Sequence, residues 1–286
     1  MKTEMTDTTQ TPSIVFDNVS FRYWNQDNWI LKNINFSVIS SEWVSIVGGN
    51  GSGKSTLVKL MNGLLKPSLG NILVFGESIE PSTIQQIRKK VGVIFQNPEE
   101  QWVGSTVEED IAFGLQNLRL SRDEMTTRID RVVRLLRLEE LRNRAIRTLS
   151  GGEKQLVTIA GVLVMEPQVI IFDEAASMLD SQNADKVHEV MSDLHRLGYT
   201  IIQITHDPED ILKADRILVL NHGRITFNGD VLTLMKKSYI LEEAQTLPPF
   251  LVRFNQELRS KGMTLPVYCG SEKELAKYIW ESTSAK

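Results

Sequence analysis

A glycine-rich segment at residues 44–56 constrains the fold of this chain more than any other part of its sequence. Four strand-like residues run into Gly-Gly-Asn-Gly-Ser-Gly-Lys-Ser-Thr, and an apolar-periodic stretch at 57–65 predicts a helix after it. The segment matches the phosphate-binding pattern G-x-x-x-x-G-K-[ST] in its strand–loop–helix context. The glycines let backbone N–H groups turn inward toward phosphate oxygens, and the helix adds the positive end of its dipole. A nucleotide site is therefore predicted here, in preference to an ordinary glycine-rich turn.

The phosphate loop and a later acidic strand end together predict a hydrolytic site. In the loop, Lys54 is expected to reach the β- and γ-phosphates and Ser55 to ligate Mg²⁺. The stretch 169–174 is an apolar strand that ends in Asp173 and Glu174. An apolar strand that delivers an aspartate to the same sheet edge as a phosphate loop is what Mg²⁺ binding requires. Asp173 would hold the metal directly or through water, and Glu174 would reach a water aimed at the γ-phosphate.

Three further features allow both a structural and a functional interpretation. His206 follows the buried strand 200–205; a lone histidine is usually structural, but this one lies at the sheet edge where ligands bind. Tyr23 and Trp24 close an expected strand, so either they cap a small core or one of them stacks on a nucleobase. Residues 150–152, Ser-Gly-Gly, head a periodic helix, where they are either an ordinary N-cap or a donor set for an anion.

The stretch 97–113 is, by its pattern, a mixed acidic and aromatic loop. It begins with a polar break that contains a proline, and it interleaves Trp102 and Phe113 with a run of acidic residues at 108–110. Exposed aromatic residues tend to mark contacts between proteins. The pattern fits plain surface and a docking surface equally well.

Length, charge and cysteine content limit the class of protein. The 286 residues suit one large domain, or one domain with an appendage. The net charge of −4 argues against a broad basic face, so no nucleic-acid partner is expected. The single cysteine, Cys269, excludes an internal disulfide and fits a reducing cytosol. The longest apolar stretches, such as 157–165, are too short to span a bilayer, so a link to a membrane must run through a partner.

The rest of the pattern alternates strands and helices. An antiparallel sheet is expected ahead of the phosphate loop, and a four-residue connection at 221–224 joins a later hairpin. Beyond about residue 231 the pattern loosens, which predicts a small appended unit. Strands are expected at 13–16, 19–23, 34–38, 71–75, 91–95, 217–220 and 225–227, and helices from 121, 150 and 180 and at 251–261 and 271–283.

The order and spacing of these motifs over residues 13–230 resemble the ATP-binding cassette of ABC transporters. The likeness is carried by the phosphate loop, Leu-Ser-Gly-Gly at 149–152, the strand ending in Asp-Glu and the later strand ending in His. It implies an α/β fold, with a P-loop NTPase core of mostly parallel sheet and flanking helices and an N-terminal antiparallel β subdomain. It further implies a cassette domain at 12–232, a helical signature subdomain at about 97–165 within it, and a C-terminal appendage at 233–286.

In that family two cassettes enclose ATP between the phosphate loop of one chain and the signature segment of the other. By the likeness, Tyr23 stacks on adenine, Gln96 senses the metal and the attacking water, and Glu174 polarises that water. Asp180 acts across the interface, and His206 holds the γ-phosphate. The metal ligands implied are Ser55, Gln96 and Asp173. The remaining residues implied to hold ATP are Gly48, Gly49, Asn50, Gly51, Ser52, Gly53, Lys54, Ser55, Thr56, Ser150, Gly151 and Gly152.

A finer likeness is to the energy-coupling factor (ECF) subfamily. Its signs are Phe-Gln-Asn-Pro at 95–98, Ser-Met-Leu-Asp at 177–180 and Leu-Pro-Pro-Phe at 247–250. In that subfamily two related ATPases drive a membrane subunit, which carries interchangeable substrate-capture proteins for vitamins or metal ions. The resemblance implies a peripheral protein at the cytoplasmic face of the membrane, paired with a sister ATPase as a heterodimer through the appendage. It implies that the coupling subunit docks between Asn97 and Phe113, and that the capture protein is reached only indirectly.

Three positions depart from the family pattern. Glu153 stands where Gln is usual, Leu156 where Arg is usual, and Ser41 where a Gly often precedes the Glu-Trp before the phosphate-loop strand. An extra carboxylate in the signature segment is hypothesised to weaken closure over an anionic ligand by like-charge repulsion. This would fit a heterodimer with one less active site.

Two alternative functions compete with an import motor. A soluble ABC ATPase that acts on ribosomes or DNA usually carries two cassettes, long coiled arms or zinc-binding cysteines, whereas this chain has one phosphate loop and one cysteine. Another ABC importer or an exporter would keep the chemistry and change the cargo. The Asn-Pro loop and the appendage argue against that alternative, though less strongly.

Overall fold

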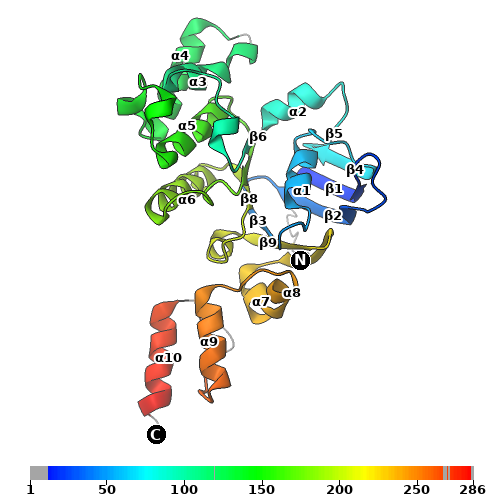
Figure 1. Ribbon diagram of the computed structural model, residues 1–286, viewed down its shortest axis with the longest axis vertical. Coiled ribbons are helices and arrows are strands. Elements are labelled where there is room, and N and C mark those ends of the chain that lie inside the picture. The colour runs from blue at the N-terminus through cyan, green and yellow to red at the C-terminus, as the bar shows by residue number, and fades with distance from the viewer. Residues whose placement is uncertain (1–11, 119, 267–268, 270, 285–286) are drawn as a thin grey trace, which may run out of the picture.

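Two β-sheets form the frame of the computed structural model, which describes residues 12–118, 120–266, 269 and 271–284 (Figure 1). A four-stranded antiparallel sheet has the order β2-β1-β4-β5, and a six-stranded sheet has the order β10-β9-β3-β8-β7-β6. The strands are β1 (Pro12–Phe21), β2 (Leu31–Ile39), β3 (Trp43–Val47), β4 (Leu69–Val74), β5 (Glu77–Ser78), β6 (Val91–Ile94), β7 (Val169–Asp173), β8 (Thr200–Ile204), β9 (Arg216–Asn221) and β10 (Arg224–Gly229).

The six-stranded sheet is parallel except for its edge strand β10. Every residue of β3, β7 and β8 is buried, as expected for parallel strands covered by helices on both faces. The register pairs Ile204 of β8 with Ile46 of β3 and with Asp173 of β7. The three strands therefore end at one edge, as the α/β interpretation of the sequence predicts.

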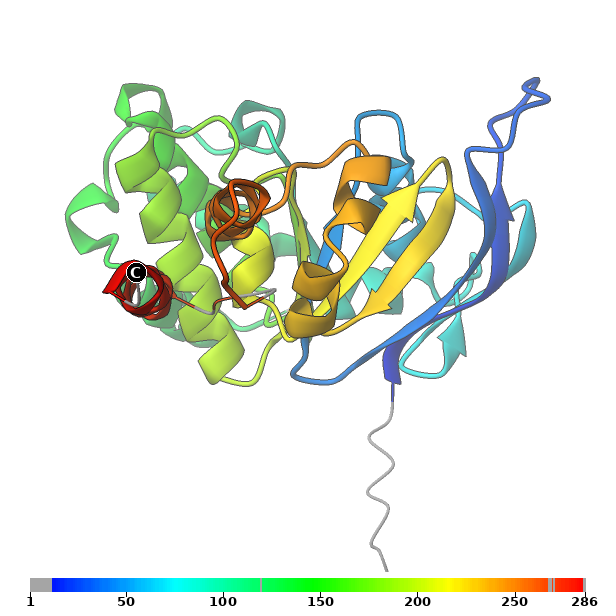
Figure 2. The same ribbon diagram turned by 90° about the horizontal axis from the view of Figure 1, so that it is seen from below.

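Helices cover both faces of this sheet. One apolar cluster joins one face to α3–α6, and a second joins the opposite face to α1, α2 and the antiparallel sheet. Figure 2 shows the α3–α6 helices (green) and the antiparallel sheet (blue) on opposite sides of the molecule. The α-helices are α1 (Lys54–Met61), α2 (Ile84–Lys90), α3 (Val107–Phe113), α4 (Arg122–Leu135), α5 (Gly151–Leu163), α6 (Ser181–Arg196), α7 (Val231–Lys236), α8 (Tyr239–Glu243), α9 (Phe250–Ser260) and α10 (Glu272–Ser284).

The structure corrects three sequence predictions. The two strands expected at 13–16 and 19–23 are one strand, β1, with a register shift near Asn18, whose φ of 51° is left-handed. The second half of the expected loop 97–113 is helix α3, because Thr106 and Glu109 form a capping box that starts it. The hairpin connection is two residues long, since β9 ends at Asn221 and β10 begins at Arg224.

The C-terminal part begins against the six-stranded sheet and then leaves it. Helices α7 and α8, which the sequence pattern did not reveal, pack through Leu234, Met235 and Leu241 onto β9 and the end of β3. Helices α9 and α10 pack on each other through a separate apolar cluster and project away from the sheets (Figure 1). Among the described helices, none combines the length and the apolar character needed to cross a bilayer.

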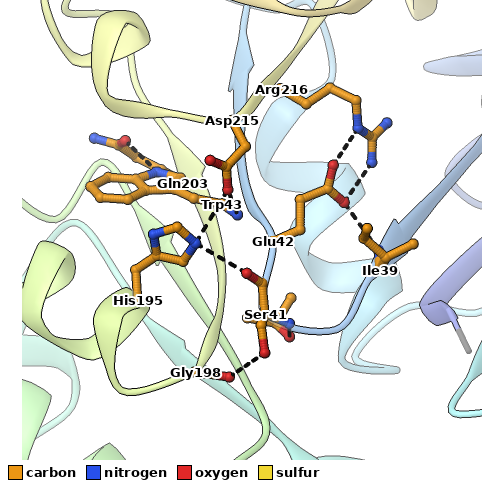
Figure 3. Close-up of polar contacts among 10 residues, drawn as sticks. Ile39, Ser41, Glu42, Trp43, His195, Gly198, Gln203, Asp215 and Arg216 are labelled. Atoms are coloured by element: carbon orange, nitrogen blue, oxygen red, sulfur yellow. Dashed lines mark hydrogen bonds and ion pairs between the residues drawn. The ribbon is translucent and has the colours of Figure 1, made fainter. Parts of the chain in front are cut away.

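A polar network ties the sheets together at the edge opposite the phosphate loop (Figure 3). Arg216 binds both oxygens of Glu42, at 2.6 and 2.9 Å, and donates to the Ser37 carbonyl of β2 at 2.6 Å. Ser41, before Glu42, has a left-handed φ of 61° and donates through Oγ to the Gly198 carbonyl at 2.8 Å. That conformation favours glycine, which explains the family preference, and the hydroxyl contact stabilises the serine found here.

We expect Arg216→Met to lower the free energy of unfolding by about 3 kcal/mol, because it leaves Glu42 buried without its cation. The side chains of Arg216 and Glu42 are only 21% and 10% exposed. Lys261→Met breaks the exposed ion pair with Glu257 and should cost much less, because water screens the exposed charges. Urea unfolding of both variants measures the difference, and equal losses would contradict this assignment.

Candidate active site

The phosphate loop connects β3 to α1 and is shaped by glycines. Gly51 and Gly53 have φ of 77° and 111°, so both are left-handed, and a Cβ on Gly53 would lie 2.7 Å from Leu31 Cδ2. Ser52 Oγ is buried and has no hydrogen-bond partner among the described residues. Lys54 turns back over the loop and donates through Nζ to the carbonyls of Gly48 and Gly49, at 2.7 and 3.1 Å. An unpartnered hydroxyl and an inward lysine at a helix N-terminus fit a phosphate ligand.

The electrostatics of the loop depend on β7. Burial lowers the pKa of Lys54, and the nearby charges of Glu174 and Asp173 oppose that effect. Burial also raises the pKa of Asp173 from 3.8 to about 6, assisted by Glu174 and opposed by Lys54 and Lys59. Asp173 is 9% exposed. A buried carboxylate with a raised pKa fits a divalent cation, because magnesium prefers oxygen ligands and its charge would stabilise the ionised form.

Glu174 and His206 come together at the ends of β7 and β8. The Glu174 amide donates to the Ile204 carbonyl at 3.0 Å, and its φ of 53° turns the chain sharply after β7. Glu174 Oε2 then lies 3.5 Å from His206 Nδ1. Both residues line a cavity of about 230 Å³ that also reaches Asp210 and α6. The structure therefore places the predicted base and the predicted histidine within reach of each other.

Gln96 and Tyr23 approach the site from the two sides. Gln96 Nε2 donates to Ser177 Oγ at 3.2 Å, and that hydroxyl donates to the Glu174 carbonyl at 2.8 Å. The Tyr23 hydroxyl lies 3.3 Å from Thr56 Oγ1, and its ring packs edge-on against Phe21. Tyr23 thus packs against the core residue Phe21 and also contacts the first turn of α1.

Relatives of this chain share nearly its full length. A sequence profile described as "ABC transporter" matches residues 31–177. The energy-coupling factor transporter ATP-binding protein EcfA1 of Geobacillus kaustophilus is 40% identical over 276 residues, which cover 96% of this chain and 99% of that protein. The protein of the same name from Enterococcus faecalis is 39% identical over 277 residues, with the same shares covered. The chain belongs to the ABC transporter family, among its energy-coupling factor ATP-binding proteins.

Solved structures of ABC proteins share the fold. The structure of cbiO1 from Clostridium perfringens, described as part of the ABC transporter complex cbiONQ, has a TM-score of 0.75 and 32% identity over 88% of this chain and 98% of that one. An ATP-binding cassette solved as a dimer in a post-hydrolysis state, bound to ADP and Pi, has a TM-score of 0.69 and 28% identity over 76% of this chain and 98% of that one. The P-loop NTPase α/β fold and the ATPase class follow from this family.

The signature segment of this ABC ATPase caps α5. Ser150 accepts from the Glu153 amide at 3.4 Å, and Glu153 accepts from the Ser150 amide at 2.7 Å. The hydrogen bond donated by the Ser150 amide lowers the pKa of the Glu153 carboxyl, and the nearby charge of Arg144 lowers it further. This is a capping box, which the Ser-x-x-Glu pattern at 150–153 contained but the sequence interpretation missed. That the Glu153 carboxylate weakens closure over a nucleotide stays a hypothesis. In the structure this carboxylate lies beside Ser150 of the signature segment.

The signature segment and the phosphate loop are held apart in this ABC cassette. Helix α5 packs on one face of the six-stranded sheet and α1 on the other. In the described part of the chain, no hydrogen bond or ion pair joins residues 150–152 to the loop. Asp180 caps α6, accepting from Asn183 N at 2.9 Å. The structure therefore keeps residues 150–152 apart from the phosphate loop of the same chain.

A buried network behind His206 was not predicted. Thr205 Oγ1 donates to Asp210 Oδ2 at 2.8 Å, and His188 Nε2 of α6 lies 2.8 Å from Asp210 Oδ1. Burial alone would raise the pKa of Asp210, but the contacts with His188 and Thr205 lower it. The contact between His188 and Asp210 joins two different elements, and no local sequence pattern signals it.

We expect Asp173→Asn to be more stable than the natural chain without nucleotide or magnesium, by about 2–3 kcal/mol above about pH 7. The pKa of Asp173 is about 6 in the folded chain against 3.8 ordinarily, so the unfolded chain loses its proton first as pH rises. Stability should therefore fall between about pH 4 and pH 6, and the difference between the two chains should vanish below about pH 4.

Urea unfolding across this pH range, in the presence of a chelator, measures the effect. Asp185→Asn, on the exposed face of α6, is the matched control: it keeps Asp173, so its stability should follow that of the natural chain across this pH range. A stability difference that stays constant with pH would contradict the charged state assigned to Asp173.

Proposed function

We propose that this chain is the ATP-hydrolysing motor of an ECF-type importer, which couples hydrolysis to uptake of a micronutrient through a membrane subunit. The observation that carries the proposal is the meeting of Lys54, Asp173, Glu174 and His206 at one sheet edge, in a chain whose relatives are ECF transporter ATP-binding proteins. The class of cargo, a vitamin or a metal ion, is taken from the subfamily resemblance alone. In this proposal the cargo itself would not contact this chain.

The hydrolytic chemistry assigns a role to each residue. The loop from Gly48 to Thr56 would cradle the phosphates through its backbone amides, with Lys54 neutralising charge on the β- and γ-phosphates. Ser55, Gln96 and Asp173 would hold Mg²⁺, whose positive charge would stabilise the charge that develops on the phosphates. Glu174 would orient and polarise the attacking water.

The roles of the remaining groups concern binding and closure. His206 would donate to the γ-phosphate, and its contact with Glu174 keeps the two groups in register. Tyr23 would stack on adenine beside the first turn of α1. Residues 150–152 and Asp180 would serve the nucleotide bound to a partner chain. Their separation from the chain's own loop supports a site shared between two ATPases, which we propose to be a heterodimer with a sister subunit.

The docking surface for the membrane subunit would be residues 97–113, at the cytoplasmic face of the membrane. Val103 and Phe113 are 61% and 41% exposed there. Asp110 holds the backbone beneath them, accepting from the amides of Val103 and Gly104 at 2.8 and 2.9 Å. Arg142 binds Glu108 through two hydrogen bonds and Asp130 through a third. Apolar side chains on a well-fixed base suit a protein contact.

Glu174→Gln is expected to keep ATP affinity and to lower kcat by a factor of about 100 or more, because the amide cannot take a proton from water. ATP binding by fluorescence and phosphate release measure the two effects. Glu189→Gln, an exposed glutamate on α6, should leave both unchanged. Retained turnover in Glu174→Gln would overturn its assignment.

Val103→Asp with Phe113→Asp is expected to abolish recovery of the membrane subunit when the chain is affinity-purified from solubilised membranes. A charge placed in an apolar contact is desolvated without a partner, which costs several kcal/mol. Leu197→Asp changes a leucine of similar exposure, 62%, at the other end of the sheet and should leave recovery unchanged. Recovery of ribosomes or DNA in place of a hydrophobic subunit would overturn the transport function itself.

A further inference from the structure

Residues 244–250, which run from the end of α8 to the first residue of α9, contact two parts of the active site. We call it the connecting segment, and we call residues 205–210, which carry His206, the switch segment. One end of the connecting segment binds the phosphate loop, and the other end binds the switch segment. The two ends are separated by only a few residues, so the C-terminal helices are attached directly to the catalytic edge of the sheet.

The phosphate-loop end of this attachment is a backbone contact. The Gly49 amide donates to the Ala244 carbonyl at 2.8 Å, and a Cβ on Gly49 would lie 3.0 Å from that oxygen and from Gln245 Cβ. Asn221, at the end of β9, donates through Nδ2 to the Glu243 carbonyl at 3.1 Å. The backbone of the phosphate loop at Gly49 is therefore hydrogen-bonded to the C-terminal part of the chain.

The switch-segment end is a carboxylate contact. Glu209 Oε1 accepts from the Phe250 amide at 2.6 Å. Phe250 is the first residue of α9, so its N–H has no partner within the helix, and a negative charge is favoured there. The Glu209 amide in turn donates to Asp207 Oδ1 at 2.9 Å, and the Asp207 amide donates to Thr205 Oγ1 at 3.0 Å. The second of these bonds spans His206, and the first joins that turn to Glu209.

The connecting segment itself is fixed in place. Pro248 and Pro249 are buried, and their rings restrict the backbone. The Thr246 amide donates to the Leu241 carbonyl at 2.8 Å. Val252 of α9 then joins the apolar cluster that covers β9 and the end of β3. A displacement of α9 is therefore transmitted to the switch segment and is not absorbed by a loose linker.

We propose that Glu209 is a positioning residue for hydrolysis, which ties the His206 turn to the C-terminal helices through the Phe250 amide. Through this tie, the position of α9 sets the position of His206 against Glu174. The C-terminal part is then a control element of the active site as well as an appendage. This inference rests on the role proposed for His206.

A double-mutant cycle tests the tie in the full chain, purified with its natural partner subunits. Glu209→Ala removes the acceptor, and Phe250→Pro removes the donor while leaving a residue that the first helical position tolerates. Each should lower kcat about tenfold with less than about a twofold change in KM for ATP, because misplacement of a group acting on the reacting phosphate affects turnover. The double variant should be no slower than either single variant, since both remove one contact.

Conservative and matched variants separate positioning from general damage. Glu209→Gln keeps an oxygen acceptor and should restore kcat. Phe250→Ala loses the same ring as the proline variant but keeps the amide, so it should be faster than Phe250→Pro. Glu242→Ala, an exposed glutamate of α8, should leave kcat unchanged. Melting temperatures report whether each variant is folded.

Two outcomes would overturn the inference. A normal kcat in Glu209→Ala would show that the tie does not position His206, and additive losses in the double variant would show that the two groups act separately. His206→Ala distinguishes this failure from failure of the proposed function. If His206→Ala keeps full turnover, the role of His206 is wrong; if it loses turnover while Glu209→Ala does not, only the tie is wrong.

Discussion

The parallel pairing of β3 with β8 and of β8 with β7 is the interaction on which the site depends. It aligns Ile46, Ile204 and Asp173 in one row, so the residues that follow each strand leave the sheet at the same edge. This register brings together the phosphate loop, Glu174 and His206, and Glu174 and His206 then contact each other. A shift of one residue in the pairing of β7 with β8 would turn Asp173 to the other face of the sheet. The apolar clusters on both faces are what keep that register fixed.

The same burial that fixes the register leaves the ligand-free site electrostatically strained. Desolvation disfavours the charged forms of both Lys54 and Asp173, and their mutual attraction compensates only in part. Ser52 Oγ lacks a partner among the described residues, and Lys54 uses the carbonyls of its own loop. Groups that are poorly satisfied without a ligand gain most when phosphate and magnesium supply the missing charges. In the proposed function, the stability lost at this site would be regained as affinity when nucleotide and magnesium bind.

What could be predicted from the sequence was local, and what was missed joins distant positions. The phosphate loop, Asp173 and Glu174 stand in contiguous patterns whose chemistry follows from the order of residues. Helix α3 and the capping box at Glu153 also have local signals. The acidic and aromatic composition of residues 97–113 favoured a loop, and the Ser-Gly-Gly motif was interpreted without the glutamate that completes its cap. The pairs Asp210–His188, Gly49–Ala244 and Glu209–Phe250 span 22 to 195 residues. Nothing near either member of such a pair signals the other.

The arrangement of α1 and α5 supports the proposal that one cassette forms only half of a nucleotide site. The first turn of α1 has no side-chain cap, whereas the capping box of α5 binds the Glu153 amide, and the two helices lie on opposite faces of a closely packed sheet. Rotation within the chain cannot bring Ser150 to its own phosphate loop without breaking that packing. In the proposed pairing, a second chain would present its signature segment instead, and binding energy from the shared nucleotide would be available to move whole subunits. With the connecting segment attached to the same edge, such a movement would reach the C-terminal helices through backbone contacts, with no flexible linker between.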